Sequence, residues 1–195
     1  MIDGGNTGHL FSSGQHLVTG FLGGGVDLFA RDVVLAGASV DATGAAGGGT
    51  VRIGGSTTDD LTVTPASTIR ADALRTGSGG QVSVWANQST ALDGAVATRG
   101  GPGGGAGGLI EVSGRGELSY GGSADAGGSS GKSGTFVLDP KNLTISDAPA
   151  GVFPQFDLID PHPTPGGSFG STVSVLKNGN VVVTNPNDNF GGMNA

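Results

Sequence analysis

Short alternating apolar segments recur along this chain, and each follows a stretch rich in glycine. Five of them are spaced alike, with their first apolar residues 25, 31, 28 and 26 positions apart. They are Val26-Asp27-Leu28, Val51-Arg52-Ile53, Val82-Ser83-Val84, Ile110-Glu111-Val112 and Phe136-Val137-Leu138. Their middle residue is polar or charged in four cases, so strand alternation turns it outward and its neighbours inward. Such a period indicates a stacked repeat architecture.

Two further families of short strands fall inside the same period. The second family precedes the glycines and comprises Val40-Asp41-Ala42, Ile69-Arg70-Ala71, Val96-Ala97-Thr98 and Ala124-Asp125-Ala126. The third is weaker and precedes the second, around Val34-Leu35, Leu61 and Val63, Leu92 and Leu118. Three short strands in about 27 residues describe one coil of a β-solenoid.

The predicted fold is therefore all-β, with coils that stack their aliphatic residues into a continuous interior ladder. A single coil cannot bury its apolar stripe, so stability comes from contacts between neighbouring coils. No segment sustains a helical i, i+3, i+4, i+7 pattern for more than about a turn before glycine interrupts it.

Glycine makes up 41 of the 195 residues, and its stretches are interpreted as corners between strands. Gly103, Gly105 and Gly108 also satisfy the dinucleotide-binding pattern G-x-G-x-x-G. That pattern needs a helix after the glycines, whereas here the strand-like segment 109–112 follows. We therefore predict a corner and no nucleotide cofactor, and we expect the number of corner glycines to explain the drift in spacing.

The charge and the apolar pattern narrow the class of partner. A net charge of −7 without a basic cluster disfavours nucleic acid. No run approaches the roughly 20 apolar residues of a membrane span, so we expect no membrane insertion. Cysteine is absent, which is compatible both with export of an unfolded chain through a pore and with the cytoplasm, so it does not separate the two. The first residues lack signal-peptide features, so a secreted protein would contain this chain as an internal piece.

Several blocks of the sequence resemble filamentous-haemagglutinin-like exoproteins, which are exported by two-partner secretion. The resemblance covers roughly residues 20 to 146 and is carried by GAAGGGTVRIGG, GSGGQVSVWAN, GAVATRGGPGGGAGGLIEVSGRGELSYGGSADA and GKSGTFVLDPKNLTI. It implies a right-handed parallel β-helix that serves as a non-enzymatic stalk or adhesive segment, secreted or held at the surface of a Gram-negative cell. It also implies an outer-membrane translocator as the export partner, recognised through a secretion domain not present here, and a host-cell, surface or polysaccharide ligand.

The C-terminal part of the sequence departs from the period. We assign residues 1–146 to the β-helix, with 1–19 as an irregular N-terminal edge, and 147–167 to a proline-containing linker. Residues 168–195 resemble the start of an FG-GAP β-propeller repeat, with a hairpin whose two-residue turn is Asn178-Gly179. Asn187-Asp188-Asn189 is interpreted as a solvated loop in preference to a calcium site, because calcium needs six or more converging oxygens.

No catalytic, cofactor-binding or metal-binding residue is assigned. His9, His16 and His162 are far apart in sequence, and His9 and His16 have no carboxylate or cysteine at metal-binding spacing. Ser12 and Ser13 lie near His16 without an orienting acid in sequence.

The alternative function is a polysaccharide-active β-helix enzyme, a lyase or a hydrolase, which would need charged residues converging on one face. Asp41, Arg70, Ala97 and Asp125 occupy one outward column, with Arg99 two positions away, and a surface ion pair is the preferred interpretation. The adjacent pair Asp59-Asp60 is assigned to a loop.

Two other features have simple structural interpretations. Trp85, the sole tryptophan, should point outward beside Ser83 and could offer a binding spot. Thr62-Val63-Thr64 has the form of an ice-binding motif, but the motif does not recur in the other coils.

Overall fold

The computed structural model describes residues 1–129, 132–145, 167–175 and 181–185. The chain divides into two compact units, residues 1–153 and 154–195, which are described separately. Within the described ranges, no helix has the length and apolar character needed to cross a membrane.

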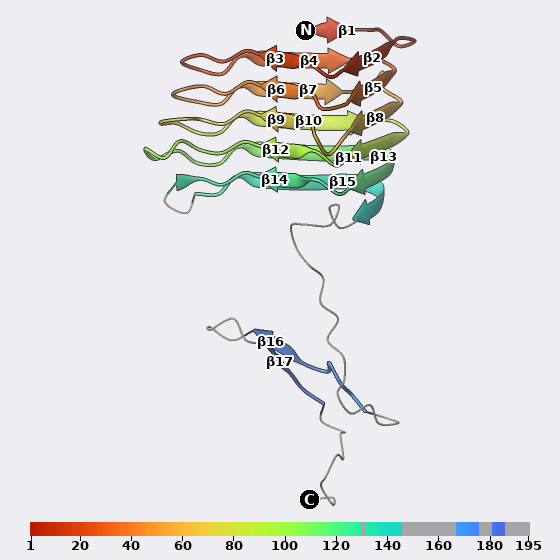
Figure 1. Ribbon diagram of the computed structural model, residues 1–195, viewed down its shortest axis with the longest axis vertical. Coiled ribbons are helices and arrows are strands. Elements are labelled where there is room, and N and C mark those ends of the chain that lie inside the picture. The colour runs from red at the N-terminus through yellow and green to blue at the C-terminus, as the bar shows by residue number, and fades with distance from the viewer. Residues whose placement is uncertain (130–131, 146–166, 176–180, 186–195) are drawn as a thin grey trace, which may run out of the picture. The chain divides into compact units, whose positions relative to one another are not determined.

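The first unit is a right-handed parallel β-helix of about five coils, as predicted (Figure 1). The strands of successive coils are β1 (Ile2–Asp3), β2 (His9–Ser12) and β3 (Gln15–Leu17); β4 (Gly25–Phe29), β5 (Asp32–Leu35) and β6 (Ser39–Asp41); β7 (Thr50–Gly54), β8 (Asp60–Val63) and β9 (Thr68–Arg70); β10 (Gln81–Ala86), β11 (Ser89–Leu92) and β12 (Ala95–Ala97); β13 (Leu109–Tyr120) and β14 (Ser123–Asp125); and β15 (Thr135–Ile145). Every strand pairs in parallel with its equivalent one coil away.

The interior ladder has the predicted register. Val26, Val51, Val82, Ile110 and Phe136 are consecutive partners through β4, β7, β10, β13 and β15. The first four are buried, whereas Phe136, on the last coil of the described residues, is 40% exposed. Each coil therefore supplies the floor on which the next coil buries its aliphatic residues, worth about 1.5–3 kcal/mol for each fully buried side chain.

The second strand family is confirmed, but the third is partly wrong in register. Val40, Ile69, Val96 and Ala124 are consecutive partners, as predicted. In the third family Val33 and Leu35 face inward, so Val34 faces outward, because adjacent strand residues point to opposite sides.

The third family also contains an inward polar residue that an apolar pattern misses. Leu118 pairs with Thr90, and Leu92 pairs with Tyr120. Thr90 is buried, and its hydroxyl has no hydrogen-bond partner among the described residues. Its partners on the two adjacent coils are Leu61 and Leu118, so a smaller, polar side chain stands between two leucines at this rung.

Glycines occupy the long corners because neighbouring coils approach backbone to backbone there. A Cβ added to Gly80 would collide with the carbonyl oxygen of Gly49, and one added to Gly105 would collide with that of Gly77. Gly77 itself has φ of 80°, a conformation that favours glycine. The stretch that contains Gly103, Gly105 and Gly108 opens directly onto β13, as predicted for a corner.

The drift in repeat length is not explained by the glycine corners alone, contrary to our expectation. In the longest repeat, five residues (55–59) connect β7 to β8, whereas two residues make the equivalent connections at 30–31 and 87–88. This longer loop is fixed to adjacent coils, because Thr58 donates to the Ala30 carbonyl and Asn87 donates to the Ser56 carbonyl.

The N-terminal edge is more regular than predicted. Residues 1–19 contain β1, β2 and β3, which pair with β4, β5 and β6 respectively. Its pattern escaped sequence analysis because few of its positions are buried; Phe11 and Leu17 are exposed.

The second unit contains the predicted hairpin. Strands β16 (Val173–Val175) and β17 (Val181–Val183) pair antiparallel, with Val175 opposite Val181. The predicted turn at Asn178-Gly179, almost all of the proposed linker (147–167) and the segment Asn187-Asp188-Asn189 lie outside the described residues. The FG-GAP resemblance stays a prediction.

Candidate functional site

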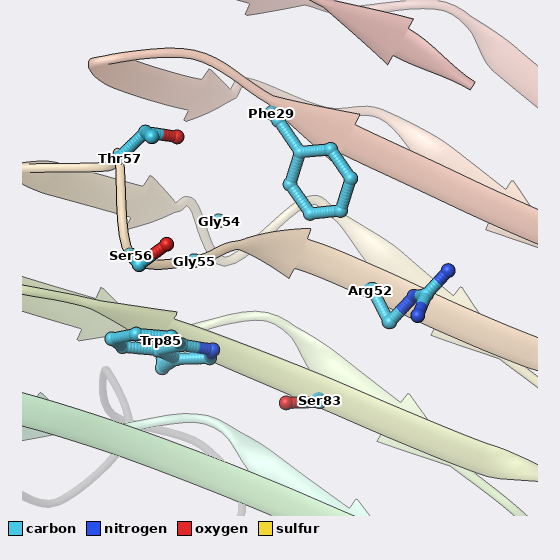
Figure 2. Close-up of a pocket in the computed structure, with 8 residues that line it drawn as sticks. All are labelled: Phe29, Arg52, Gly54, Gly55, Ser56, Thr57, Ser83 and Trp85. Carbon is cyan, nitrogen blue, oxygen red and sulfur yellow. The ribbon is translucent and has the colours of Figure 1, made fainter. Parts of the chain in front are cut away.

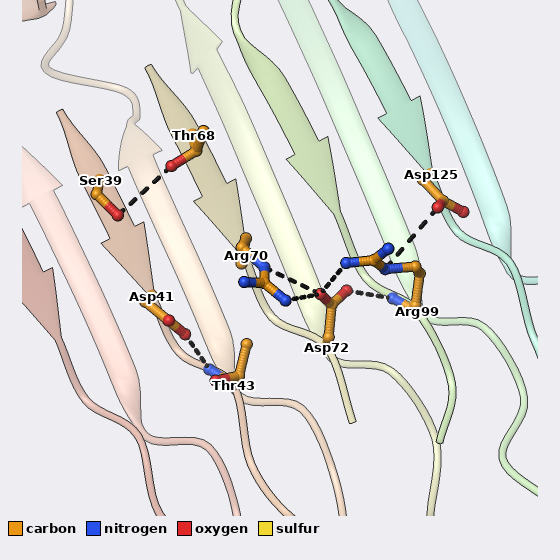
Figure 3. Close-up of polar contacts among 8 residues, drawn as sticks. All are labelled: Ser39, Asp41, Thr43, Thr68, Arg70, Asp72, Arg99 and Asp125. Atoms are coloured by element: carbon orange, nitrogen blue, oxygen red, sulfur yellow. Dashed lines mark hydrogen bonds and ion pairs between the residues drawn. The ribbon is translucent and has the colours of Figure 1, made fainter. Parts of the chain in front are cut away.

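The densest charge cluster of the described residues centres on a buried aspartate that sequence analysis missed. The outward column of Asp41, Arg70, Ala97 and Asp125 aligns as predicted. However, Arg70 does not pair with Asp41: its Nη2 lies 3.0 Å from Oδ2 of Asp72, in the corner that follows β9 (Figure 3). The Asp41 carboxylate accepts a hydrogen bond from the backbone N–H of Thr43 instead.

Asp72 is held from two successive coils. Its side chain is 2% exposed, and the Arg99 Nη2 lies 3.0 Å from the Oδ2 that Arg70 also contacts. The backbone N–H of Arg99 donates to Oδ1 at 2.7 Å. Arg99 Nε also lies 3.8 Å from Asp125 Oδ2, so the cluster spans three coils.

The electrostatics of this cluster indicate a permanently charged, structural group. Burial raises the pKa of Asp72, but the hydrogen bonds from Arg99 and Arg70 outweigh it, and the net pKa lies below the usual value. The hydrogen bond to Asp72 raises the pKa of Arg99. A general acid or base would need a pKa near the working pH, whereas this carboxylate is ionised at neutral pH.

A second ion pair joins neighbouring coils on the opposite sheet. Asp27 and Arg52 are partners in β4 and β7, and Arg52 Nε lies 2.6 Å from Asp27 Oδ1. The hydrogen bond from Arg52 lowers the pKa of Asp27. Sequence analysis had placed both residues at outward middle positions of successive strands, which is the signal that identifies the pair.

Each of the two described histidines contacts one side chain, and the partner of His9, Asp32, also pairs with Arg31, whose Nη2 lies 2.8 Å from Asp32 Oδ2. His9 Nδ1 lies 2.7 Å from Asp32 Oδ2, and Ser12 Oγ lies 2.8 Å from His16 Nε2. The Ser12–His16 contact has the first two members of a nucleophile–base arrangement, but no carboxylate bonds to His16 in the described ranges. The same ranges contain no group of three or more His, Asp or Glu residues that could hold a metal ion. His162 lies outside them.

The remaining candidates fall on the outer faces. Asp59 lies in the β7–β8 loop, as predicted, whereas Asp60 is the first residue of β8 and accepts a hydrogen bond from Ser89, so the loop assignment was wrong for Asp60. Thr62 points outward between Val34 and Ala91, so threonine does not extend along this column.

Trp85 points outward on β10, as predicted, and forms part of a groove. The column contains Gly54 opposite Trp85, and Phe29 belongs to the coil before Gly54. A groove of about 240 Å³ lies between the two aromatic rings; it is lined by Phe29, Arg52, Gly54, Gly55, Ser56, Thr57, Ser83 and Trp85 (Figure 2). Arg115, from the coil on the other side of β10, lies 5.6 Å from the centre of the Trp85 ring.

Comparison with known proteins finds no matching family model, no similar curated protein and no similar solved structure. The resemblance to filamentous-haemagglutinin-like exoproteins remains a prediction.

Proposed function

We propose that this chain is a non-enzymatic shaft segment of a large secreted bacterial surface protein, which displays adhesive regions away from the cell. The observation that carries the proposal is the ladder from Val26 to Phe136, which keeps one register through five successive coils. Such a stack lengthens by about 4.8 Å per coil and resists bending, because each coil is bonded along its strands to the next.

The distribution of charge supports a mechanical role over the polysaccharide-active alternative. The enclosed carboxylate of Asp72 contacts two arginines, and Asp27 contacts Arg52 across adjacent coils. These contacts bond neighbouring coils to each other. Hydrolases and lyases instead require carboxylates or bases that face an open substrate groove with a suitable pKa.

Export and attachment belong to the same proposal. Two-partner secretion would pass the chain through an outer-membrane translocator, and a chain without cysteine cannot be held up there by a disulfide. The coils would then form outside the cell, with a host cell, a surface or a polysaccharide as the ligand of the whole protein.

Antibody labelling of the producing bacterium tests this proposal. We expect an antibody against residues 1–145 to label intact cells or the culture medium, and we expect labelling to disappear when the adjacent transporter gene is deleted. Labelling of wild-type cells only after permeabilisation would refute a surface location. In parallel, release of reducing ends or unsaturated products from pectin or glucans would establish the enzymatic alternative.

A further inference from the structure

The groove between Phe29 and Trp85 has a floor of glycine residues and is closed at one end by a loop. Gly54 and Gly55 occupy the floor, and the five-residue loop 55–59 stands at one end. This loop is longer than its equivalents at 30–31 and 87–88, and its hydrogen bonds to neighbouring coils hold it in place. The groove is therefore a local departure from the repeat, made by an insertion beside two aromatic residues.

One face of Trp85 is available within this groove. Arg115 covers the ring from the side of β13, whereas Gly54 and Gly55 lie on the side of β7. In Figure 2 Trp85 is seen edge-on below these glycines and Phe29 lies above them. Two rungs separate the backbones of the aromatic residues, about 9–10 Å along the stack. The Phe29 ring reaches over the glycines, with its Cδ1 and Cε1 3.8 Å from the place of a Cβ on Gly55. A saturated ring therefore fits against the Trp85 face within the groove of about 240 Å³, with the Phe29 ring at its edge.

The polar groups of the groove are suited to hydroxyls and not to a charged ligand. Ser56, Thr57 and Ser83 line it with hydroxyl groups. None of these three side-chain hydroxyls forms a hydrogen bond within the described part of the chain. The charged side chain of the groove, Arg52, is neutralised by Asp27 at 2.6 Å. An aromatic face with a few hydroxyl groups around it is the chemistry that recognises a neutral sugar ring, through its C–H face and its hydroxyls.

We propose that this groove binds one neutral hexose unit of a polysaccharide, stacked on Trp85. The inference goes beyond the proposed shaft and does not require a surface location, because binding is measured on the purified chain. A single ring in an open groove should bind with a dissociation constant of about 1 mM.

Trp85 is the sole tryptophan of the chain, so its fluorescence reports on the groove directly. The purified protein is titrated with the methyl glycosides of glucose, galactose and mannose and with cellobiose and maltose. We expect a saturable change in emission with at least one of them. Phe29→Ala should weaken binding about three- to tenfold. Ser83→Leu, which fills the groove from an outward strand position, should abolish it, with far-UV circular dichroism unchanged.

Phe21→Ala is the matched control, because Phe21 is an exposed phenylalanine outside the groove and its loss should leave the titration unchanged. The proposal is overturned if none of the neutral sugars gives saturation, or if saturation persists unchanged in both groove variants. It is equally overturned if glucuronate or N-acetylphenylalanine amide saturates Trp85 and the neutral sugars do not.

Discussion

Replacement of Ile110 by aspartate, compared with replacement of its neighbour Glu111, tests which side of each strand faces the interior. Ile110 is fully buried and lies between Val82 and Phe136 in the ladder. Glu111 points outward on the same strand, where its carboxylate accepts one hydrogen bond from Ser113 at 3.4 Å. The two substitutions therefore change adjacent residues with opposite environments.

The expected cost of Ile110→Asp has two parts. Removal of the buried aliphatic side chain costs about 2–5 kcal/mol in the free energy of unfolding. The introduced carboxyl has no partner among the aliphatics and must be neutral when the protein is folded, which costs about 4 kcal/mol at pH 7 for a group of ordinary pKa near 4. The sum, about 6–9 kcal/mol, rivals the whole stability of an ordinary domain. Glu111→Ala should change stability by less than about 0.5 kcal/mol.

The pH dependence gives this prediction a specific signature. The folded-state pKa of the introduced carboxyl is raised, so its charge penalty is absent below about pH 4 and grows as pH rises. Urea denaturation followed by far-UV circular dichroism should therefore show a larger defect for Ile110→Asp at pH 7 than at pH 4. Equal defects for the two variants, or the larger one for Glu111→Ala, would refute the inward and outward assignment.

Three further substitutions, with Gly25→Ala as a control for one of them, probe the contacts between coils by the same denaturation assay. Asp72→Ala should cost about 2–3 kcal/mol at pH 7, because it removes charge-assisted bonds to two arginines. Since the folded-state pKa of Asp72 is lowered, that stability is present above pH ~4 and is lost as pH falls further. The difference in stability between the variant and the wild type should therefore shrink in acid. A difference that stays constant with pH would contradict the role assigned to the Asp72 carboxylate. Gly80→Ala should cost more than about 3 kcal/mol, because the added Cβ collides with the Gly49 carbonyl. Gly25→Ala, whose Cβ meets no atom within 4 Å, should be neutral or stabilise the fold by about 0.5 kcal/mol. Similar denaturation midpoints for the two variants would contradict the backbone packing described. Thr58→Val should cost about 1–2 kcal/mol by leaving the Ala30 carbonyl without its donor, and an unchanged midpoint would show that this bond does not hold the β7–β8 loop.

The ladder could be predicted from sequence because it depends on a simple alternation. Val51, Val82 and Ile110 each begin an apolar–polar–apolar triplet, and one face of a strand buries alternate residues. Where that pattern contains a polar residue, as at Thr90, or where the exposed coil has little to bury, as in residues 1–19, the signal weakens. Register errors in the third family follow from choosing adjacent residues, such as Val34 and Leu35, for the same face.

The charge cluster and the groove depend on information that alternation does not carry. Asp72 lies in a corner two residues beyond its strand, where side-chain direction depends on the local backbone path. The 31-residue spacing between Val51 and Val82 signalled extra residues but not the corner that contains them. Phe29, Gly54 and Trp85 each lie three positions after the first apolar residue of a repeat, so correct alignment of the coils would have placed them in one column.

Electron–electron distances between paired spin labels test the stacked shaft most directly. The exposed residues Gly25, Thr50, Gln81 and Thr135 belong to one outward column, with Leu109 between the last two. The chain has no cysteine of its own, so labels attach only at introduced sites. With Thr135→Cys as the fixed site, the backbone separation should be about 19 Å for Gly25→Cys and about 14 Å for Thr50→Cys, decreasing by about 4.8 Å per rung. Distances that are broad, or that do not shorten from the first pair to the second, would contradict a single continuous stack of coils.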